Sequence, residues 1–273
     1  MKPFSYHIHS EFCDGRSTAE EMVLSAIENG FDSLGFSSHS HLPSFPELYG
    51  MKKESVEPYC REVLRLKENY KDKINIFLGI EQDSFGTISS IPKEVCYVIG
   101  SVHHVTQNGS FMPVDHSIEH VKDGVKRLFD GDVMAYVEEY YKEVSRLYDK
   151  TRCDIVGHID LITKFNEKEF IIDTGSKRYK NAALSAAEKL ARLGLIFEIN
   201  TGAIGRGYRT VPYPSEEILH VIRECGGKIT YSSDCHKSDA IAVGFEDAIA
   251  LAKKCGFKSF MKLGTDGFYE EEF

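Results

Sequence analysis

Cysteine patterns that build disulfide frameworks or thiolate metal sites are missing from this 273-residue sequence. The seven cysteines are odd in number and scattered, and no two of them form a CxxC pair. Neither a disulfide framework nor a zinc–thiolate site is therefore expected. Unpaired thiols are typical of a reducing compartment, so we expect a cytoplasmic protein.

Long apolar runs and an excess of basic residues are also missing. No apolar stretch approaches the roughly 20 residues of a transmembrane helix, and the opening residues, MKPFSYHIHSEF, do not resemble a signal peptide. The 33 Lys and Arg are outnumbered by 42 Asp and Glu, which gives a net charge of −9. Because an acidic surface repels phosphate backbones, we expect neither nucleic acid nor a membrane as a partner.

The chain does contain a regular alternation of short apolar runs and segments with helical periodicity. The expected strands are 4–8, 33–37, 74–80, 97–101, 154–157, 196–199, 228–232 and 259–263. The expected helices are 18–29, 54–70, 117–150, 177–193, 215–225 and 239–255.

This alternation predicts an α/β fold with a parallel sheet. About seven or eight such units favour a closed TIM-like barrel, with a doubly wound open sheet as the alternative. No GxGxxG follows an early strand, which weakens a dinucleotide-binding form of the open sheet. No linker, low-complexity segment or repeat interrupts the chain, so residues 1–273 are expected to form a single domain.

The placement of the 11 histidines is the main functional signal. Eight of them follow directly on predicted strands: 7, 9, 39, 41, 103, 104, 158 and 236. The carboxyl ends of barrel strands converge on one face, where the active sites of such barrels lie. Because side chains two apart on a strand share a face, His7 and His9 can hold one cation, and Asp234 and His236 repeat this geometry.

Imidazole and carboxylate ligands without thiolate suit Zn²⁺, Mn²⁺ or Fe²⁺ better than Ca²⁺ or Mg²⁺. The third strand end adds Glu81 and Asp83, and other strand ends add His39, His103 and His158. These exceed the four ligands of one structural zinc, so two or three divalent ions are expected. Closely spaced metals can activate water and bridge a phosphate, which predicts phosphate-ester hydrolysis.

The sequence resembles the PHP (polymerase and histidinol phosphatase) family, and most closely its histidinol-phosphate phosphatases. The resemblance runs along nearly the whole chain, and it implies a distorted (β/α)₇ barrel with a trinuclear metal site. Its motifs are His7-x-His9, Gly35-Phe36-Ser37-Ser38-His39, Gly79-Ile80-Glu81-x-Asp83, Ser101-Val102-His103, Gly157-His158-Ile159-Asp160, Glu198-Ile199-Asn200-Thr201 and Ser233-Asp234-x-His236.

The resemblance also implies how the ligands divide among the three metals. One metal would be held by His7, His9, Glu81 and Asp234; the second by His39, His236 and Asp14; and the third by His103 and His158, with Glu81 as the bridge. Asp14 stands where many relatives carry a histidine ligand. The residues expected to be catalytic are Glu81, His103, Asp234 and His236.

The activity implied by the resemblance is hydrolysis of L-histidinol phosphate by metal-activated water, in histidine biosynthesis. One alternative is a PHP phosphoesterase acting on another small phosphate or a nucleotide. The other is a PHP domain that binds metal and regulates without catalysis.

Residues for substrate recognition are expected around the same strand ends. Arg206 and Arg209 lie in a glycine-rich loop, and their guanidinium groups suit phosphate oxygens, although a solvated surface loop is the alternative. Asp160 and Glu198 would either face the cationic end of the substrate or orient ligand histidines. The expected substrate-binding residues are Arg206, Arg209, Asn200, His41, His104 and Asp160.

Overall fold

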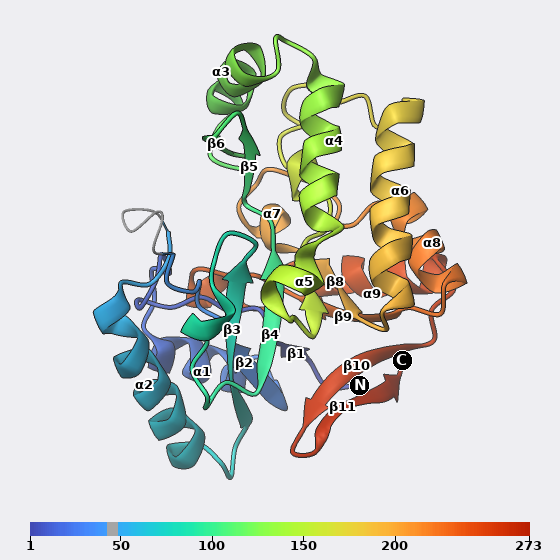
Figure 1. Ribbon diagram of the computed structural model, residues 1–273. Helices are drawn as coiled ribbons and strands as arrows, with labels where there is room; N and C mark the ends of the chain where they lie inside the picture. Colours follow the sequence, from blue (N-terminus) through green and yellow to red (C-terminus); the bar gives the residue numbers. More distant parts are fainter. Residues whose placement is uncertain (43–48) are drawn as a thin grey trace.

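The computed structural model describes residues 1–42 and 49–273. Seven parallel strands form one sheet in the order β1-β2-β3-β4-β7-β8-β9 (Figure 1). A backbone bridge between Ile8 and Cys235 joins the chain beyond β1 to the chain beyond β9, with His9 N 3.0 Å from Cys235 O. The expected barrel is therefore confirmed as a nearly closed one. Its strands are β1 (Phe4–Ser5), β2 (Ser33–Phe36), β3 (Asn75–Asp83), β4 (Tyr97–Ser101), β7 (Ile155–Val156), β8 (Ile196–Asn200) and β9 (Lys228–Ser232).

Helices surround this sheet, and most of them connect consecutive strands (Figure 1). The α-helices are α1 (Ala19–Glu28), α2 (Val56–Asn69), α3 (Ile118–Leu128), α4 (Val133–Val144), α5 (Leu147–Thr151), α6 (Lys177–Arg192), α7 (Gly202–Gly205), α8 (Glu216–Glu224) and α9 (Phe245–Lys254). Short 3₁₀ turns are η1 (Lys53–Ser55), η2 (Ile88–Ser90), η3 (Leu161–Thr163) and η4 (Ser238–Ala240).

The single helix expected over 117–150 is wrong, because the structure has α3, α4 and α5 there. Asp130 and Gly131 break the helix with positive φ angles of 52° and 82°. Asp132 then caps α4, and its carboxylate accepts hydrogen bonds from the backbone N–H groups of Met134 and Ala135. A helix cannot continue through two left-handed residues, and this capping side chain starts a new one.

Two hairpins lie outside the barrel sheet. β5 (His104–Gln107) and β6 (Ser110–Pro113) form an antiparallel pair that the sequence did not indicate. The expected strand 259–263 is β10 (Ser259–Gly264), which pairs antiparallel with β11 (Gly267–Glu272) and does not join the seven-stranded sheet. In Figure 1 both chain termini lie beside this second hairpin.

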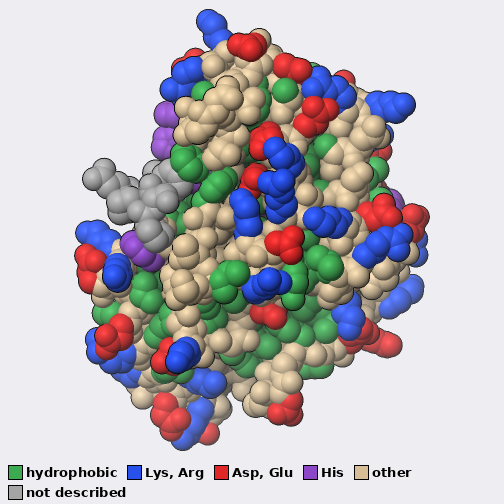
Figure 2. All heavy atoms as spheres, in the orientation of Figure 1, with side chains coloured by type: hydrophobic (Ala, Val, Ile, Leu, Met, Phe, Trp, Pro, Cys, Tyr) green, Lys and Arg blue, Asp and Glu red, His purple; other side chains and the backbone are tan. Residues whose placement is uncertain are grey.

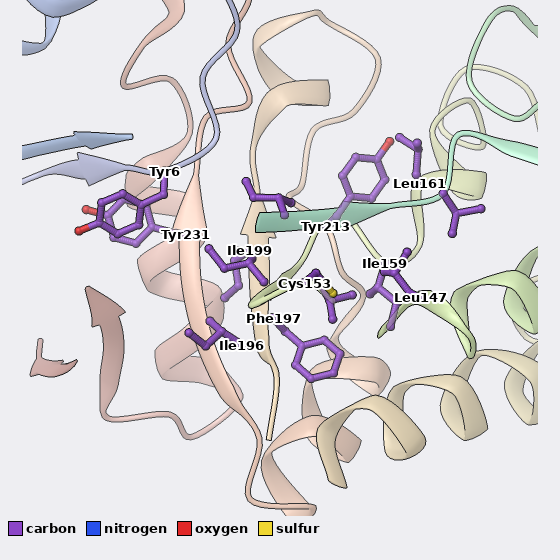
Figure 3. Close-up of a cluster of buried hydrophobic side chains, with 14 of the residues drawn as sticks. Tyr6, Leu147, Cys153, Ile159, Leu161, Ile196, Phe197, Ile199, Tyr213 and Tyr231 are labelled. Atoms are coloured by element: carbon purple, nitrogen blue, oxygen red, sulfur yellow. The ribbon is translucent and has the colours of Figure 1, made fainter. Parts of the chain in front are cut away.

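Large buried side chains hold the strands in place, and Figure 3 shows part of this core, including Tyr6, Phe197, Ile199 and Tyr231. The Tyr97 hydroxyl donates to Tyr6 O at 2.6 Å, and Phe36 O lies 3.0 Å from it. A Cβ atom at position 79 would lie 2.2 Å from the Tyr97 ring, so this close approach requires Gly79. This packing fixes the ends of β1 and β2, from which His7 and His39 follow.

Acidic and basic side chains are interspersed over the face drawn in Figure 2. Within residues 1–42 and 49–273, no helix combines the length and the apolar character needed to cross a bilayer.

Candidate metal centre

Histidines from five strand ends meet at one end of the barrel. The His9 ring lies 4.4 Å from the His39 ring and 4.1 Å from the His236 ring, measured between centroids. The His103 and His158 rings are 5.1 Å apart. The barrel thus brings together side chains that are more than two hundred residues apart in the sequence.

Glu81 lies at the centre of these rings. Its Oε2 is 2.8 Å from His39 Nδ1 and 3.2 Å from His7 Nε2. Its Oε1 is 3.1 Å from His158 Nε2 and 3.4 Å from His103 Nε2. Burial alone would raise the pKa of this carboxyl group, but the surrounding histidines lower it well below its ordinary value.

Two aspartates complete the cluster on the side of β9. Asp234 Oδ1 is 3.1 Å from His9 Nε2, and Asp14 Oδ2 is 3.2 Å from His236 Nε2. Asp234 has a φ angle of 44°, which is uncommon for a residue other than glycine. Backbone strain of this kind often marks a functional site, and here it sets the direction of a central carboxylate.

The residues fit a cluster of divalent cations. His7 Nε2, His9 Nε2 and Glu81 Oε2 are buried, and although polar atoms of the cluster lie within 3.2 Å of each, none of the three makes a hydrogen bond with the described residues. Unpaired buried polar atoms are costly, and a coordinated cation would satisfy all three. The candidate ligand atoms, which lie within 4.8 Å of one another in each group, come from His9, Asp14, His39 and His236; His7, Glu81 and His158; His7, His9 and Asp234; and His39, Glu81 and His103.

These groups overlap, so the ions they would bind are neighbours. His7, His9 and Asp234 form one group, without the Glu81 that the family resemblance adds to them, and Asp14, His39 and His236 form another together with His9. His103 and His158, which the resemblance assigns to one metal, fall into separate groups that share Glu81.

The Glu198 carboxylate, behind the cluster, contacts two candidate ligands. Glu198 Oε1 is 2.7 Å from His7 Nδ1, and Glu198 Oε2 accepts from the backbone N–H of His158 at 2.9 Å. Burial favours the neutral His7 ring, but Glu198 and Glu81 raise the pKa of His7 well above its ordinary value. With the Nδ1 proton of His7 held by Glu198, its Nε2 faces the cluster. Glu198 therefore orients a candidate ligand histidine, which was one of the two roles expected for it.

The cluster lies in a cavity of about 840 Å³. Among the described residues, the Lys and Arg side chains that line it are Arg16, Lys164, Arg206 and Lys237. The Arg206 guanidinium reaches the cluster, with Nη2 3.2 Å from Asp234 Oδ2 and Nη1 3.0 Å from Asp234 O. A cluster of cation ligands next to Lys and Arg side chains can hold the oxygens of a small phosphate.

Of the expected substrate-binding residues, Arg206 and His104 line this cavity, whereas Arg209 does not. The Arg209 guanidinium donates to Thr163 Oγ1 at 2.6 Å and stacks over Tyr213 at 4.3 Å. These contacts give Arg209 a place in the packing between two loops rather than in the cavity lining.

Asn200, Asp160 and His41 also lie outside the cavity lining. Asn200 is fully buried and donates to Glu198 Oε2 at 2.9 Å. Asp160 is 1% exposed and accepts from the backbone N–H of Ser215 at 2.9 Å, and His41 Nδ1 lies 3.0 Å from the carbonyl oxygen of Met51. All three are held by other protein groups.

Other residues line the cavity that the sequence analysis did not single out, among them Tyr49, Asp115 and Lys164. Lys164 Nζ is 2.8 Å from Asp115 O and 3.2 Å from Asp115 Oδ2. Lys164 follows closely on the His158–Asp160 motif, and this position after a strand end could have indicated that it lies near the site. Asp115 follows the unpredicted hairpin β5–β6, and no strand-end pattern marked it.

A barrel with a histidine and carboxylate cluster at the carboxyl ends of its strands defines a class of metal-binding α/β proteins. A sequence model of the PHP domain matches residues 5–202, which is more than half of the chain. The chain therefore belongs to the PHP domain family. The match ends before Asp234 and His236, which β9 adds to the cluster.

Similar proteins cover nearly the whole chain. The "Probable histidinol-phosphatase" of Schizosaccharomyces pombe is 30% identical over 97% of this chain and 91% of its own length. The histidinol-phosphatase of Bacillus subtilis is 24% identical, over 91% of this chain and 98% of its own length.

Two solved structures share the fold. A Listeria monocytogenes protein aligns with a TM-score of 0.79 and 22% identity, covering 89% of this chain and 99% of its own. Histidinol phosphate phosphatase from Lactococcus lactis, complexed with zinc, L-histidinol and phosphate, aligns with a TM-score of 0.73 and 21% identity. That alignment covers 97% of this chain and 98% of the other.

Proposed function

We propose that this chain is a metal-dependent phosphomonoesterase that hydrolyses L-histidinol phosphate to L-histidinol and phosphate. The observation that carries the proposal is the central Glu81 carboxylate among four histidine rings, at the floor of a cavity with basic walls. Relatives named as histidinol-phosphatases align over nearly the full chain, which supports this substrate.

The metal ligands in this proposal are His7, His9, Asp14, His39, Glu81, His103, His158, Asp234 and His236, which together would hold two or three divalent ions. Imidazole and carboxylate donors suit zinc, manganese or iron. When bound, such ions supply the Lewis acidity that activates water and neutralises phosphate charge. Glu81, His103, Asp234 and His236 would act at the reacting phosphate through this centre.

Arg206 and Asp115 would recognise opposite charges of the substrate. The Arg206 guanidinium, next to Asp234, is placed to contact a phosphate held on the cluster. Burial alone would raise the pKa of Asp115, but the Lys164 ammonium lowers it to about 2, so the carboxylate is ionised at neutral pH. Asp115 would therefore bind the ammonium group of an amino-alcohol phosphate, the role that Asp160 cannot fill from its buried position.

We further propose that water attacks phosphorus directly, without a phosphoenzyme. Cys235 lies between two candidate ligands, but its thiol is buried, and burial raises its pKa to about 12. A thiol that stays protonated at neutral pH is a poor nucleophile. Chiral phosphate esters would therefore be hydrolysed with inversion, whereas retention or a trapped phosphorylated residue would contradict direct attack.

A phosphate-release assay tests the proposed activity. The purified protein, loaded in turn with Zn²⁺, Mn²⁺ or Fe²⁺, is given L-histidinol phosphate, other small phosphomonoesters and nucleotides. We expect the highest kcat/KM with L-histidinol phosphate and its loss when a chelator removes the metal. Preference for another ester would reassign the substrate, and no turnover with any metal would favour a regulatory domain.

We also infer a cytoplasmic location for the protein. All seven cysteines are free thiols, and four of them, Cys60, Cys153, Cys235 and Cys255, are buried, as suits a reducing compartment. Cell fractionation followed by thiol titration of the isolated protein tests this inference, and recovery from an oxidising compartment would contradict it.

A further inference from the structure

Tyr49 covers one side of the metal centre. It lines the cavity, and its ring contacts three histidines, with centroid distances of 4.4 Å to His39, 5.0 Å to His103 and 5.8 Å to His104. Only the last contact is close to parallel, at 16°. A ring in this position shields two candidate ligands from solvent.

The Tyr49 hydroxyl donates to Asp83 Oδ2 at 2.9 Å. The same carboxylate oxygen is 3.0 Å from His103 Nδ1, and it also accepts from the backbone N–H of His103 at 3.4 Å. The other carboxylate oxygen, Oδ1, accepts from the backbone N–H of Phe85 at 2.7 Å. Asp83 is thus held by donors on both oxygens.

The contact with Asp83 determines which ring nitrogen of His103 carries a proton. Because Asp83 accepts at Nδ1, that nitrogen carries a proton, which leaves Nε2, 3.4 Å from Glu81 Oε1, as the nitrogen that a cation in the cluster would bind. The Tyr49 hydroxyl has one proton, which it gives to Asp83. His104 Nδ1, 3.3 Å from the Tyr49 oxygen, therefore acts as the donor in that contact.

We propose that Tyr49 is a positioning residue, which fixes His103 as a metal ligand by holding Asp83 in place. The hydroxyl holds Asp83 through its hydrogen bond, and the ring packs against His39 and His103. The role of Tyr49 has no counterpart in the strand-end pattern, because the residue lies in the connection between β2 and α2. The inference concerns metal binding, and it adds to the proposed phosphatase activity without requiring its particular substrate.

The test compares Tyr49→Phe with the wild-type protein in a titration of the metal-free protein with Zn²⁺, followed with a competing chelator dye. We expect one of the Zn²⁺ binding steps to weaken by up to about 10-fold, because Asp83, whose own loss as the partner of His103 would cost about 10–100-fold, stays in place but loses one of its donors. The other steps should be unchanged. With Co²⁺ as the probe, the d–d absorption bands should change, since the geometry of one ion would be altered.

Tyr70→Phe is the matched control. Its hydroxyl also donates to a carboxylate, Glu20 Oε1 at 2.8 Å, but at the surface and away from the cluster. This variant should bind Zn²⁺ as the wild-type protein does. In an Asp83→Asn background, Tyr49→Phe should add little further loss, because the two changes break one chain of contacts.

Two results would overturn the inference. One is unchanged Zn²⁺ affinity in Tyr49→Phe. The other is equal weakening of every step together with a lower Tm of the metal-free protein, which would mean a general packing role. Neither readout involves substrate, so failure to hydrolyse L-histidinol phosphate would reject the proposed function and leave this inference standing.

Discussion

The guanidinium of Arg206 lies 3.2 Å from Asp234 Oδ2, and this ion pair joins the basic wall of the cavity to the metal centre. Burial alone would raise the pKa of Asp234, but Arg206 and the neighbouring histidines lower it well below its ordinary value. The carboxylate is therefore available as a ligand at neutral pH, and the arginine is held where a bound phosphate would lie.

Replacing Arg206 with Ala should raise KM for L-histidinol phosphate by about 10–150-fold, the loss expected for a charge-assisted contact. Arg209→Ala is the comparison from the same loop, and its KM should stay close to the wild-type value, because its guanidinium is held by Thr163. Steady-state kinetics and metal analysis of both variants check this. Equal increases in KM for the two variants would contradict the proposal that Arg206, and not Arg209, contacts the phosphate.

Gly202 provides the space for the ion pair. A Cβ atom at this position would lie 2.8 Å from Asp234 Oδ2 and 3.0 Å from Arg206 Nη2. We expect Gly202→Ala to displace both groups, lowering metal content and kcat/KM together. Gly205→Ala is a matched control in α7, since its Cβ would find its nearest neighbour at 3.8 Å. Normal metal content in Gly202→Ala would show that the site tolerates the added methyl group.

Glu81→Gln should affect several ions at once, because both carboxylate oxygens face candidate ligand groups. Loss of the partner of a ligand typically costs about 10–100-fold in metal affinity, so loss of a shared ligand should cost at least about 100-fold in activity. Glu57→Gln, at an exposed glutamate, serves as the control. Metal analysis and phosphate release measure both variants. Full metal content and turnover in Glu81→Gln would invalidate the proposed centre.

Asp115→Asn should reduce selectivity for substrates that carry an ammonium group. We expect kcat/KM for L-histidinol phosphate to fall by about 10–150-fold, as for a lost charge-assisted hydrogen bond. The value for phenyl phosphate, which has no ammonium group, should fall much less. The ratio of the two kcat/KM values is the measurement. A parallel fall for both esters would indicate that Asp115 acts on Lys164 or the cluster instead.

Much of the fold could be predicted because its signals are local. The helix expected over 18–29 begins with a capping box of Thr18 and Glu21, in which Glu21 N lies 3.2 Å from Thr18 Oγ1. Gly30 and Gly194 follow their helices with φ angles of 74° and 79°, as helix-ending glycines should. The break at Asp130 and Gly131 was missed, because the periodicity of the apolar residues continues across it.

The sequence by itself determined that the histidines and carboxylates of the strand ends would meet on one side of the barrel. Strand periodicity places His7 and His9 on one face, and parallel strands bring their carboxyl ends to one side of the barrel. Only the tertiary structure decided which polar residues face the cavity and which lie behind the ligands. Asn200 and Asp160 lie at strand ends just as His158 does, but Asn200 bonds to Glu198 and Asp160 to the Ser215 N–H, and neither lines the cavity. Tyr49 and Asp115 reach the cavity from connections without periodicity. Loop paths depend on contacts between distant segments, and local sequence patterns do not record those contacts.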